Sequence, residues 1–173
     1  MNEIEAKGIF EKQFLENLDG FSLVAESTQE FTGCFVFFYQ NNEYIQSCGL
    51  ADMSIGNGPV IVCKRTGNIF EAGTAYSSEH YVAAFEACGD PFGELTPKIS
   101  VYGLEKGANK VAATKLIKAE SCLGLRDSKL IIDNALENEA SQFSTESVEN
   151  SQKTVVQLQE YGFKCKQLWS KQC

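Results

Sequence analysis

Residues 107–137 read "GANKVAATKLIKAESCLGLRDSKLIIDNALE" and predict two consecutive helices that meet at Gly124. With Lys110 as the origin and about 100° per residue, Lys118 falls near ~80° and Lys115 near ~140° around the first helix. The apolar residues fall between about 200° and 340°, and they are Ala112, Ala113, Leu116 and Ile117. The first helix is therefore expected to be basic on one face and apolar on the opposite one.

One apolar residue lies on the basic face. Val111 falls near ~100°, among the lysines. Positive charge steers an acidic partner, and an exposed valine adds buried area once the partner has docked, so this face is typical of a protein-contact site. The predicted contact set continues onto the second helix and consists of Lys110, Val111, Lys115, Lys118, Arg126 and Lys129. The alternative is a basic helical face that is only solvated.

The charge of the chain is distributed unevenly. The chain has 173 residues and a net charge of −8, and its 43% hydrophobic and 22% charged residues are typical of a folded protein. Residues 1–95 hold 4 basic and 14 acidic side chains, whereas residues 96–173 hold 11 and 9. This asymmetry predicts two domains, 1–92 and 97–173, joined through the connector "CGDPFGELTPK" at residues 88–98.

The first domain has the pattern of an antiparallel sheet flanked by helices. Apolar residues at every fourth position predict a helix over residues 4–18. Short β-branched and aromatic runs predict strands at "FSLVAEST" (21–28), "GCFVFFYQ" (33–40) and "EYIQSCG" (43–49). The second of these runs is dense enough in apolar residues to be a central strand.

A turn, a hairpin and a helix complete the first domain. "GNGP", residues 56–59, predicts a turn in which Asn57 and Gly58 tolerate positive φ. The runs on either side of "RTGN" predict a hairpin over residues 60–74. Ser77 or Ser78 can cap a helix whose buried stripe is formed by Tyr81, Val82, Phe85 and Cys88. The predicted class is α+β.

The second domain alternates strands and helices. Strands are predicted at residues 98–104, 141–145 and 163–169, and a third helix at 147–162 ends at a glycine. With the two helices of residues 107–137, the predicted order is β-α-α-β-α-β. The whole chain is therefore expected to be an α+β protein of two domains.

The first domain resembles the YrhB-like immunity-protein family, also called immunity protein 35. The resemblance covers roughly residues 4–88 and is carried by "GNGPVIVCKRTGNIFEAGTAYSSEHYVAAFE" (56–86), which follows "FVFFYQNNEYIQSCG" (35–49). It implies a small bacterial domain that neutralises a co-encoded polymorphic toxin by binding it.

The second domain resembles the C-terminal domain of the bacterial ribosomal stalk protein. "GANKVAATKLIKAESCLGLRDSK" (107–129) carries the resemblance, which covers about residues 97–169. In that family the helical hairpin recruits translation GTPases, which implies the same contact role for the basic residues here. The stalk protein's N-terminal dimerisation segment and hinge have no counterpart in this sequence, so a ribosomal role does not follow.

Little in the sequence indicates catalysis. The seven cysteines form no CxxC pair and are expected to be reduced and mostly buried. The single histidine, His80, lies in a predicted helix, so a thiol enzyme built on a Cys–His pair remains a distant alternative. We expect no metal and no cofactor. The acidic net charge argues against nucleic-acid binding, and the N-terminus has no signal or membrane segment, which predicts a cytoplasmic location.

These observations predict a non-enzymatic bacterial immunity protein that binds and occludes a cognate toxin. The acidic first domain is the expected main contact, and its predicted contact residues are Glu43, Asp52, Asn57 and Glu71. Such acids alternatively serve only to keep the surface hydrated. The second hypothesis is an adaptor whose basic helical hairpin docks on a translation GTPase.

Overall fold

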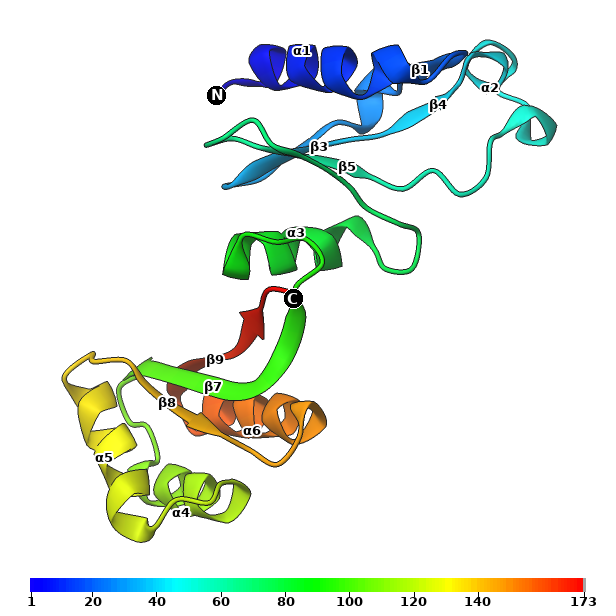
Figure 1. Ribbon diagram of the computed structural model, residues 1–173. Helices are drawn as coiled ribbons and strands as arrows, with labels where there is room; N and C mark the ends of the chain where they lie inside the picture. Colours follow the sequence, from blue (N-terminus) through cyan, green and yellow to red (C-terminus); the bar gives the residue numbers. More distant parts are fainter. Residues whose placement is uncertain (173) are drawn as a thin grey trace. The chain divides into compact units, whose positions relative to one another are not determined.

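The computed structural model describes residues 1–172 and shows a mixed α+β protein (Figure 1). Six α-helices and three antiparallel sheets are present in this part of the chain, which confirms the predicted α+β class. The chain separates into two compact units. The first unit is Met1–Gly93 with the described residues that follow Ser170, and the second is Glu94–Ser170.

The first unit combines three helices with two sheets. Its helices are α1 (Glu3–Gln13), α2 (Asn42–Ser47) and α3 (Ser78–Cys88). The larger sheet has the order β2 (Gln29–Glu30), β3 (Cys34–Phe37), β5 (Val60–Cys63), β6 (Ile69–Glu71). A two-stranded sheet pairs β1 (Phe21–Leu23) with β4 (Tyr39–Asn41). Short 3-10 turns lie at η1 (Leu15–Asn17), η2 (Ala25–Ser27) and η3 (Leu50–Asp52).

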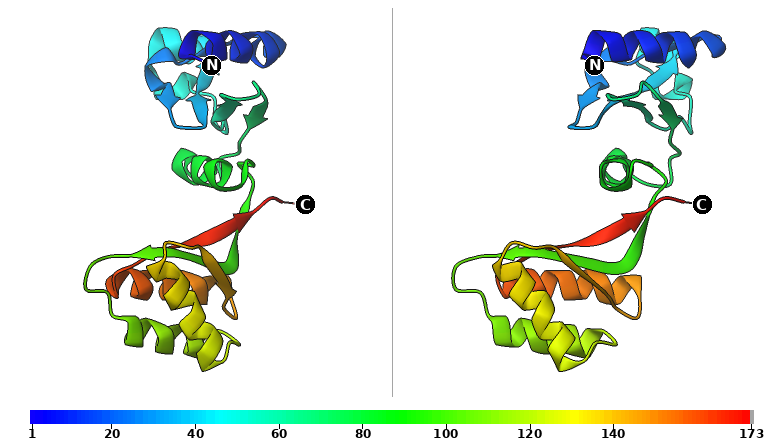
Figure 2. Two further views of the ribbon diagram at one scale, coloured as in Figure 1. Left: turned by 90° about the vertical axis from the view of Figure 1, so that its left-hand side faces the viewer. Right: turned by 60° about the vertical axis from the view of Figure 1, so that its left-hand side comes forward.

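The larger sheet of the first unit is covered on both faces. α1 and α3 lie on opposite sides of it (Figures 1 and 2). Every residue of β3 and β5 is buried. Phe35, Phe37, Val60 and Val62 pack with α1, and the alternate residues Cys34, Val36, Ile61 and Cys63 pack with α3. Continuous apolar strands of this kind need two covering layers, which the flanking helices supply.

α1 is shorter than the predicted helix over 4–18. Asn2 caps its start in a capping box with Glu5. The helix ends at Gln13, whose carbonyl accepts a hydrogen bond from the Asn17 side-chain amide at 3.1 Å. Because that amide satisfies a helix-end carbonyl, the chain tightens into the 3-10 turn η1 instead of continuing.

The strand predicted at residues 43–49 is wrong, because α2 occupies this segment. The Asn41 side chain accepts a hydrogen bond from the Tyr44 amide at 2.9 Å and so caps a helix directly after β4. Cys48 ends the helix in the left-handed region with φ 53°. The local cap therefore overrides the β propensity of a short aromatic and β-branched run.

The predicted turn at residues 56–59 is stabilised differently from the expectation. Positive φ falls on Gly56, at 98°, and not on Asn57 or Gly58. Gly58 is needed for a close approach, since a Cβ there would lie 1.8 Å from the Ala72 carbonyl oxygen. The predicted hairpin is confirmed as β5 and β6, joined by residues 64–68.

The second unit is a three-stranded sheet with three helices. Its strands have the order β8 (Ser141–Ser144), β7 (Glu94–Leu104), β9 (Phe163–Ser170). The helices are α4 (Lys110–Glu120), α5 (Leu125–Leu136) and α6 (Val148–Glu160). They lie on one side of the sheet in Figure 2. One apolar cluster joins this side of the sheet to all three helices, with Ile99, Ile117, Ile132 and Leu158 among its buried members.

The helices of the second unit agree closely with the sequence prediction, and its first strand does not. Gly124 is the N-cap of α5, and Gly162 follows α6 with φ 86°. β7 begins at Glu94, inside the predicted connector. Pro97 is tolerated there because the β7–β9 register shifts between Leu95 and Ile99, where a proline costs no ladder bond.

Candidate protein-binding surfaces

A groove of about 330 Å³ lies between α4 and α5, and we call it the hairpin groove. Its lining residues come from both helices and are Lys110, Val111, Thr114, Lys115, Leu125, Lys129, Ile132 and Asp133. Asn109 starts α4 by accepting a hydrogen bond from the Ala112 amide at 3.1 Å, which fixes where the first turn begins. α4 and α5 pack against each other around Ala113 and Ile132.

The hairpin groove has an apolar floor and an exposed apolar rim. Ile132 is only 2% exposed and closes the floor. Val111 is 66% exposed and Leu125 is 58% exposed, so each can be covered by another molecule without any rearrangement of the core. Exposed apolar side chains that line a groove are typical of a helix or peptide docking site.

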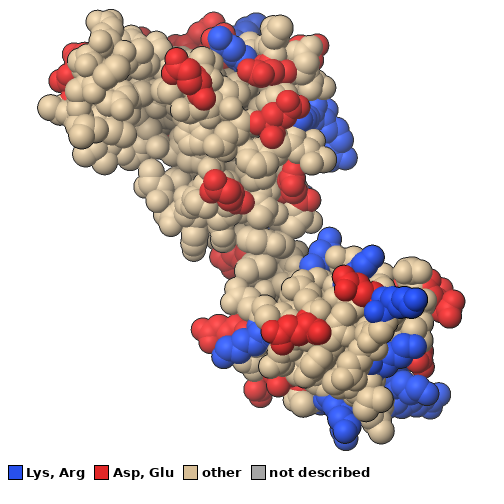
Figure 3. Space-filling view, turned by 180° about the vertical axis from the view of Figure 1, so that it is seen from behind, with Lys and Arg blue, Asp and Glu red and all other residues tan. Residues whose placement is uncertain are grey.

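Cations surround these apolar side chains. Lys110, Lys115 and Lys129 line the groove and are exposed. The ion pairs found among residues 1–172 are Lys7–Glu11 and Lys64–Glu30, so none of them neutralises a lysine of the groove. Figure 3 shows Lys and Arg side chains gathered on the second unit, with acids among them. A partner with acidic residues around an apolar centre is complementary to this groove.

The structure brings together four of the six residues predicted for the basic hairpin. Lys118 and Arg126 are exposed but do not line the groove. The sequence reasoning missed other lining residues, which are Thr114, Leu125, Ile132 and Asp133. Their spacing held a signal, because Leu125, Lys129 and Asp133 recur every fourth residue and so share one face of α5.

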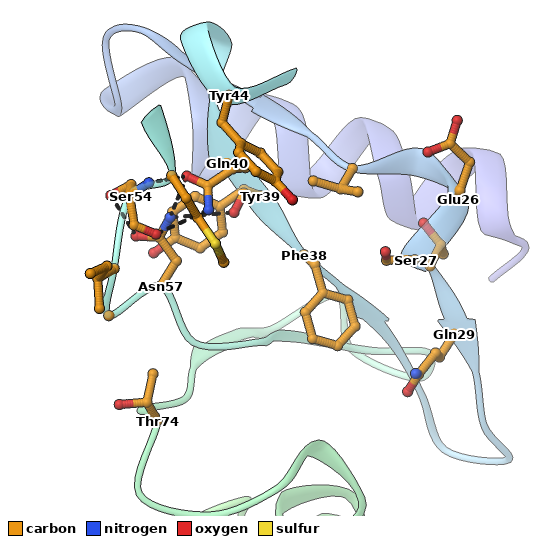
Figure 4. Close-up of a pocket in the computed structure, with 15 residues that line it drawn as sticks. Glu26, Ser27, Gln29, Phe38, Tyr39, Gln40, Tyr44, Ser54, Asn57 and Thr74 are labelled. Carbon is orange, nitrogen blue, oxygen red and sulfur yellow. Dashed lines mark hydrogen bonds between the residues drawn. The ribbon is translucent and has the colours of Figure 1, made fainter. Parts of the chain in front are cut away.

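The first unit contains a larger pocket of about 620 Å³ (Figure 4). One wall is formed by residues 53–57 and the opposite wall by residues 26–29, with Phe38, Tyr39 and Gln40 between them and Tyr44 at one end. The Gln29 Oε1 atom is buried and has no hydrogen-bond partner among the described residues. Because the atom is shielded from solvent, a donor from another molecule reaches it only if the Gln29 side chain moves.

A buried amide holds the wall of the pocket in place. Gln40 is 5% exposed, and its Oε1 accepts from the Ser54 and Asn41 amides at 3.0 and 2.9 Å. Its Nε2 donates to the Ser54 carbonyl at 3.0 Å. The Asn57 side-chain amide donates to the same Oε1 at 3.3 Å. This network fixes the loop from α2 to β5 against the sheet, so the pocket is preformed.

The end of α2 and the loop that follows it expose several large apolar side chains, and we call residues 45–55 the apolar loop. Ile55 is 94% exposed, Leu50 is 82% exposed, and Ile45 and Met53 are also exposed. Met53 and Ile55 line the pocket, so the apolar loop and the pocket form one continuous surface. An isolated exposed leucine is unremarkable, but four exposed apolar side chains within residues 45–55 make this segment a candidate contact surface.

The contact residues predicted for the first unit differ in their partners. Glu43 is exposed on α2. The Asp52 carboxylate accepts from the Ser47 hydroxyl at 2.6 Å and braces the apolar loop. Glu71 accepts from the Tyr39 hydroxyl at 3.3 Å. Asn57 lines the pocket. Asp52 and Asn57 thus shape the surface, Glu71 is not among the residues that line the pocket, and Glu43 and the pocket residue Glu26 carry exposed charge.

The thiols differ in burial, and the histidine stacks on a tyrosine ring. Of the six cysteines in the described chain, Cys34, Cys63 and Cys165 are buried, while Cys48 and Cys122 are exposed, so fewer are buried than the sequence predicted. His80 stacks on the Tyr76 ring at 4.2 Å between centroids. Burial raises the pKa of the Cys165 thiol to about 11. No group of three metal-ligating side chains is found in residues 1–172.

Comparison of the chain with protein-family models, with curated proteins and with solved structures found no match. The two resemblances stated from the sequence therefore remain predictions. No helix among the described residues has the length and apolar character needed to cross a membrane.

Proposed function

We propose that the protein is a non-enzymatic immunity protein that binds a toxin and blocks it by steric occlusion. The observation that carries the proposal is the apolar loop beside the pocket of the first unit. Its exposed side chains bury apolar area only when another macromolecule covers them. The acids around it, Glu26 and Glu43, favour a partner whose contact surface is apolar at the centre and basic at the edge.

The preformed character of the surface supports this role. The Gln40 network and the Asp52–Ser47 bond hold the loop before any partner arrives. An inhibitor whose contact surface is already ordered loses less conformational entropy on binding, which allows tight occlusion.

Co-expression with the protein encoded by the neighbouring reading frame tests the proposal. We expect the chain to restore growth of cells that make this toxin. Leu50→Asp and Ile55→Asp should weaken toxin binding about tenfold or more, because each places a charge where an apolar contact is made. Ile4→Asp is the matched control, since Ile4 is 83% exposed on α1 and does not belong to the apolar loop.

These binding measurements distinguish the loss of a specific contact from general damage to the protein. Unchanged binding in both loop variants would rule out the apolar loop as the contact surface. An equal loss in the Ile4→Asp control would attribute the effect to the acquired charge alone. Absence of any growth rescue by the unaltered chain would contradict the immunity function itself.

A second function is favoured by the hairpin groove. We propose as the alternative that the protein docks on a translation GTPase through this groove. The apolar floor at Ile132, the exposed Val111 and Leu125 and the surrounding lysines form a surface that differs in charge from the first unit. The two functions are compatible if the toxin itself engages the translation machinery.

Titration of the chain with purified elongation factors tests the alternative. Val111→Asp and Lys115→Glu should each weaken binding about tenfold, because the groove would lose apolar contact or gain repulsion. Val156→Asp and Lys153→Glu on α6 are matched controls outside the groove, and Val156 is 55% exposed. If the elongation factors bind the groove variants as tightly as the unaltered chain, the hairpin groove is not the docking site.

A further inference from the structure

The two central strands of the first unit place two cysteines directly opposite one another. Cys34 begins β3, Cys63 ends β5, and the two are register partners. The Lys64 amide donates to the Gly33 carbonyl at 3.0 Å, so the ladder bond flanks the cysteines instead of joining them. In such a non-hydrogen-bonded pair the Cα atoms lie about 4.5 Å apart and the side chains approach most closely.

Both cysteine side chains lie on the same face of the sheet. They belong to the apolar cluster that packs on α3. Both are free thiols. A disulfide requires Cα atoms about 4.4–6.8 Å apart, and a directly opposed pair on antiparallel strands meets this condition without a change of register. We propose that Cys34 and Cys63 form a thiol-oxidation site, at which hydrogen peroxide converts the two thiols into a disulfide between β3 and β5.

The surroundings of the two thiols indicate which one reacts with the peroxide and which one then forms the disulfide. Cys63 is 8% exposed and precedes the hairpin turn at residues 64–68. Burial acts to raise its pKa, but hydrogen bonds from Thr66 and from the Arg65 backbone, with the Arg65 charge, outweigh burial and lower the pKa. Because the thiolate is the nucleophile, Cys63 is the thiol that meets the oxidant first.

Cys34 is the thiol that reacts second, with the oxidised Cys63. It is 0% exposed, and burial, with the Glu86 charge, raises its pKa to about 11. A buried neutral thiol does not react with an oxidant in solution, but it does not need solvent access to attack the sulfur of the residue opposite it. The Lys64 ammonium acts on Cys34 in the opposite direction and favours its thiolate.

The chemistry proceeds in two steps. The Cys63 thiolate attacks one oxygen of the peroxide, an S–O bond forms, the O–O bond breaks, and the released hydroxide takes a proton to become water. The Cys34 sulfur then attacks the Cys63 sulfenic acid, the S–S bond forms, and the S–O bond breaks. The proton of Cys34 leaves with the hydroxide as a second water. The two sulfurs together lose two electrons, and the peroxide gains them.

Disulfide mapping of the full chain tests this proposal. The native protein is treated with hydrogen peroxide, remaining thiols are blocked, and the chain is cut after Asp and Glu. Cleavage at Glu30, Glu43, Asp52 and Glu71 separates Cys34, Cys48 and Cys63 into the peptides 31–43, 44–52 and 53–71. We expect a disulfide-linked product of 31–43 with 53–71, and its loss after reduction with dithiothreitol.

Two substitutions assign the roles. Cys34→Ser should stop the linked product and leave Cys63 as a sulfenic acid that dimedone captures, whereas Cys63→Ser should stop both the product and the capture. The exposed Cys48 and Cys122 serve as internal controls for indiscriminate oxidation. A product linking Cys34 or Cys63 mainly to another cysteine, or no product while Cys48 and Cys122 oxidise, would overturn the proposal. The mapping uses the unaltered chain, so it stands even if a variant does not fold.

Discussion

The two larger sheets are both antiparallel, but they bury their strands in different ways. In the first unit, β3 and β5 are buried on both faces by α1 and α3. In the second unit, Val101 and Cys165 belong to the cluster with the helices and are buried, while Tyr102, Lys164 and Lys166 are exposed. The central strands of a sheet covered on both faces are apolar throughout, whereas the strands of a sheet covered on one face carry polar residues on the other face.

This difference also decides where each unit can present a contact surface. The first sheet has no open face, so its candidate surface is the apolar loop and the pocket beside the sheet. The second unit stacks its three helices on one side of the sheet, and the outer side of α4 and α5 supplies the hairpin groove. The candidate contact surfaces therefore lie at a connecting segment in one unit and between helices in the other.

The largest expected effect comes from truncating one aromatic residue in each sheet. Phe37→Ala should lower the free energy of unfolding by about 3–5 kcal/mol, because Phe37 is fully buried and stacks on Phe10 with centroids 5.0 Å apart. Tyr102→Ala, at a position 41% exposed, should cost less than about 1 kcal/mol. Denaturant unfolding measures both, and similar costs would show that the two sheets do not differ in this way.

Substitution of two glycines in the loop before β5 should give the next largest loss of stability. Gly58→Ala should cost about 3 kcal/mol, because the added Cβ meets the Ala72 carbonyl and must displace β5 or the chain after β6. Gly56→Ala should cost about 1–2 kcal/mol, from its positive φ alone, since no atom lies within 4 Å of the added Cβ. Thermal unfolding ranks the two variants, and the reverse order would contradict the close approach at Gly58.

A helix cap from each unit gives a smaller effect. Asn41→Ala and Ser147→Ala remove the side chains that accept from the Tyr44 and Asn150 amides, and each should cost about 1 kcal/mol. Asn41 also donates to the Asp52 carbonyl at 2.7 Å, so its loss should speed amide hydrogen exchange in the apolar loop as well. If exchange in the loop is unchanged, that bond does not hold the loop.

The smallest effect is a dependence of stability on alkaline pH. Burial, and then the Glu71 carboxylate, raise the pKa of Tyr39 above its ordinary value. A raised pKa in the folded state gives stability that is complete below about pH 10 and is lost as pH rises through the folded pKa. The free energy of unfolding of Tyr39→Phe should therefore fall less steeply above about pH 10 than that of the unaltered chain. If the two free energies of unfolding fall with the same slope, ionisation of Tyr39 does not cause the loss of stability at alkaline pH.

Much of the secondary structure was predictable because its signals are local. The spacing of Ala113 and Ile117 predicted α4 and its buried side, and Gly124 predicted the break before α5. Local signals also explain the failures. The run at residues 43–49 is too short for its periodicity to separate strand from helix, and the Asn41 cap decided for helix.

The candidate surfaces were only partly predictable. Helical angles placed Lys110, Val111 and Lys115 on one exposed side of α4, and the structure bears this out. The same reasoning could not separate Lys129, which lines the groove, from Arg126, which does not, because that depends on how α5 packs on α4. The apolar loop was missed because residues 45–49 were assigned to a strand and no pattern in the sequence indicated that Leu50, Met53 and Ile55 would be exposed.

The α+β class, the unequal charge of the two halves and most helix positions could be read from the chain alone, because composition and periodicity act between neighbours along it. The pairing of Cys34 with Cys63, the approach of Gly58 to Ala72 and the joining of Leu125 and Val111 in one groove emerge only in the folded molecule. Register and packing bring together residues far apart in sequence, and no local pattern encodes which of them meet.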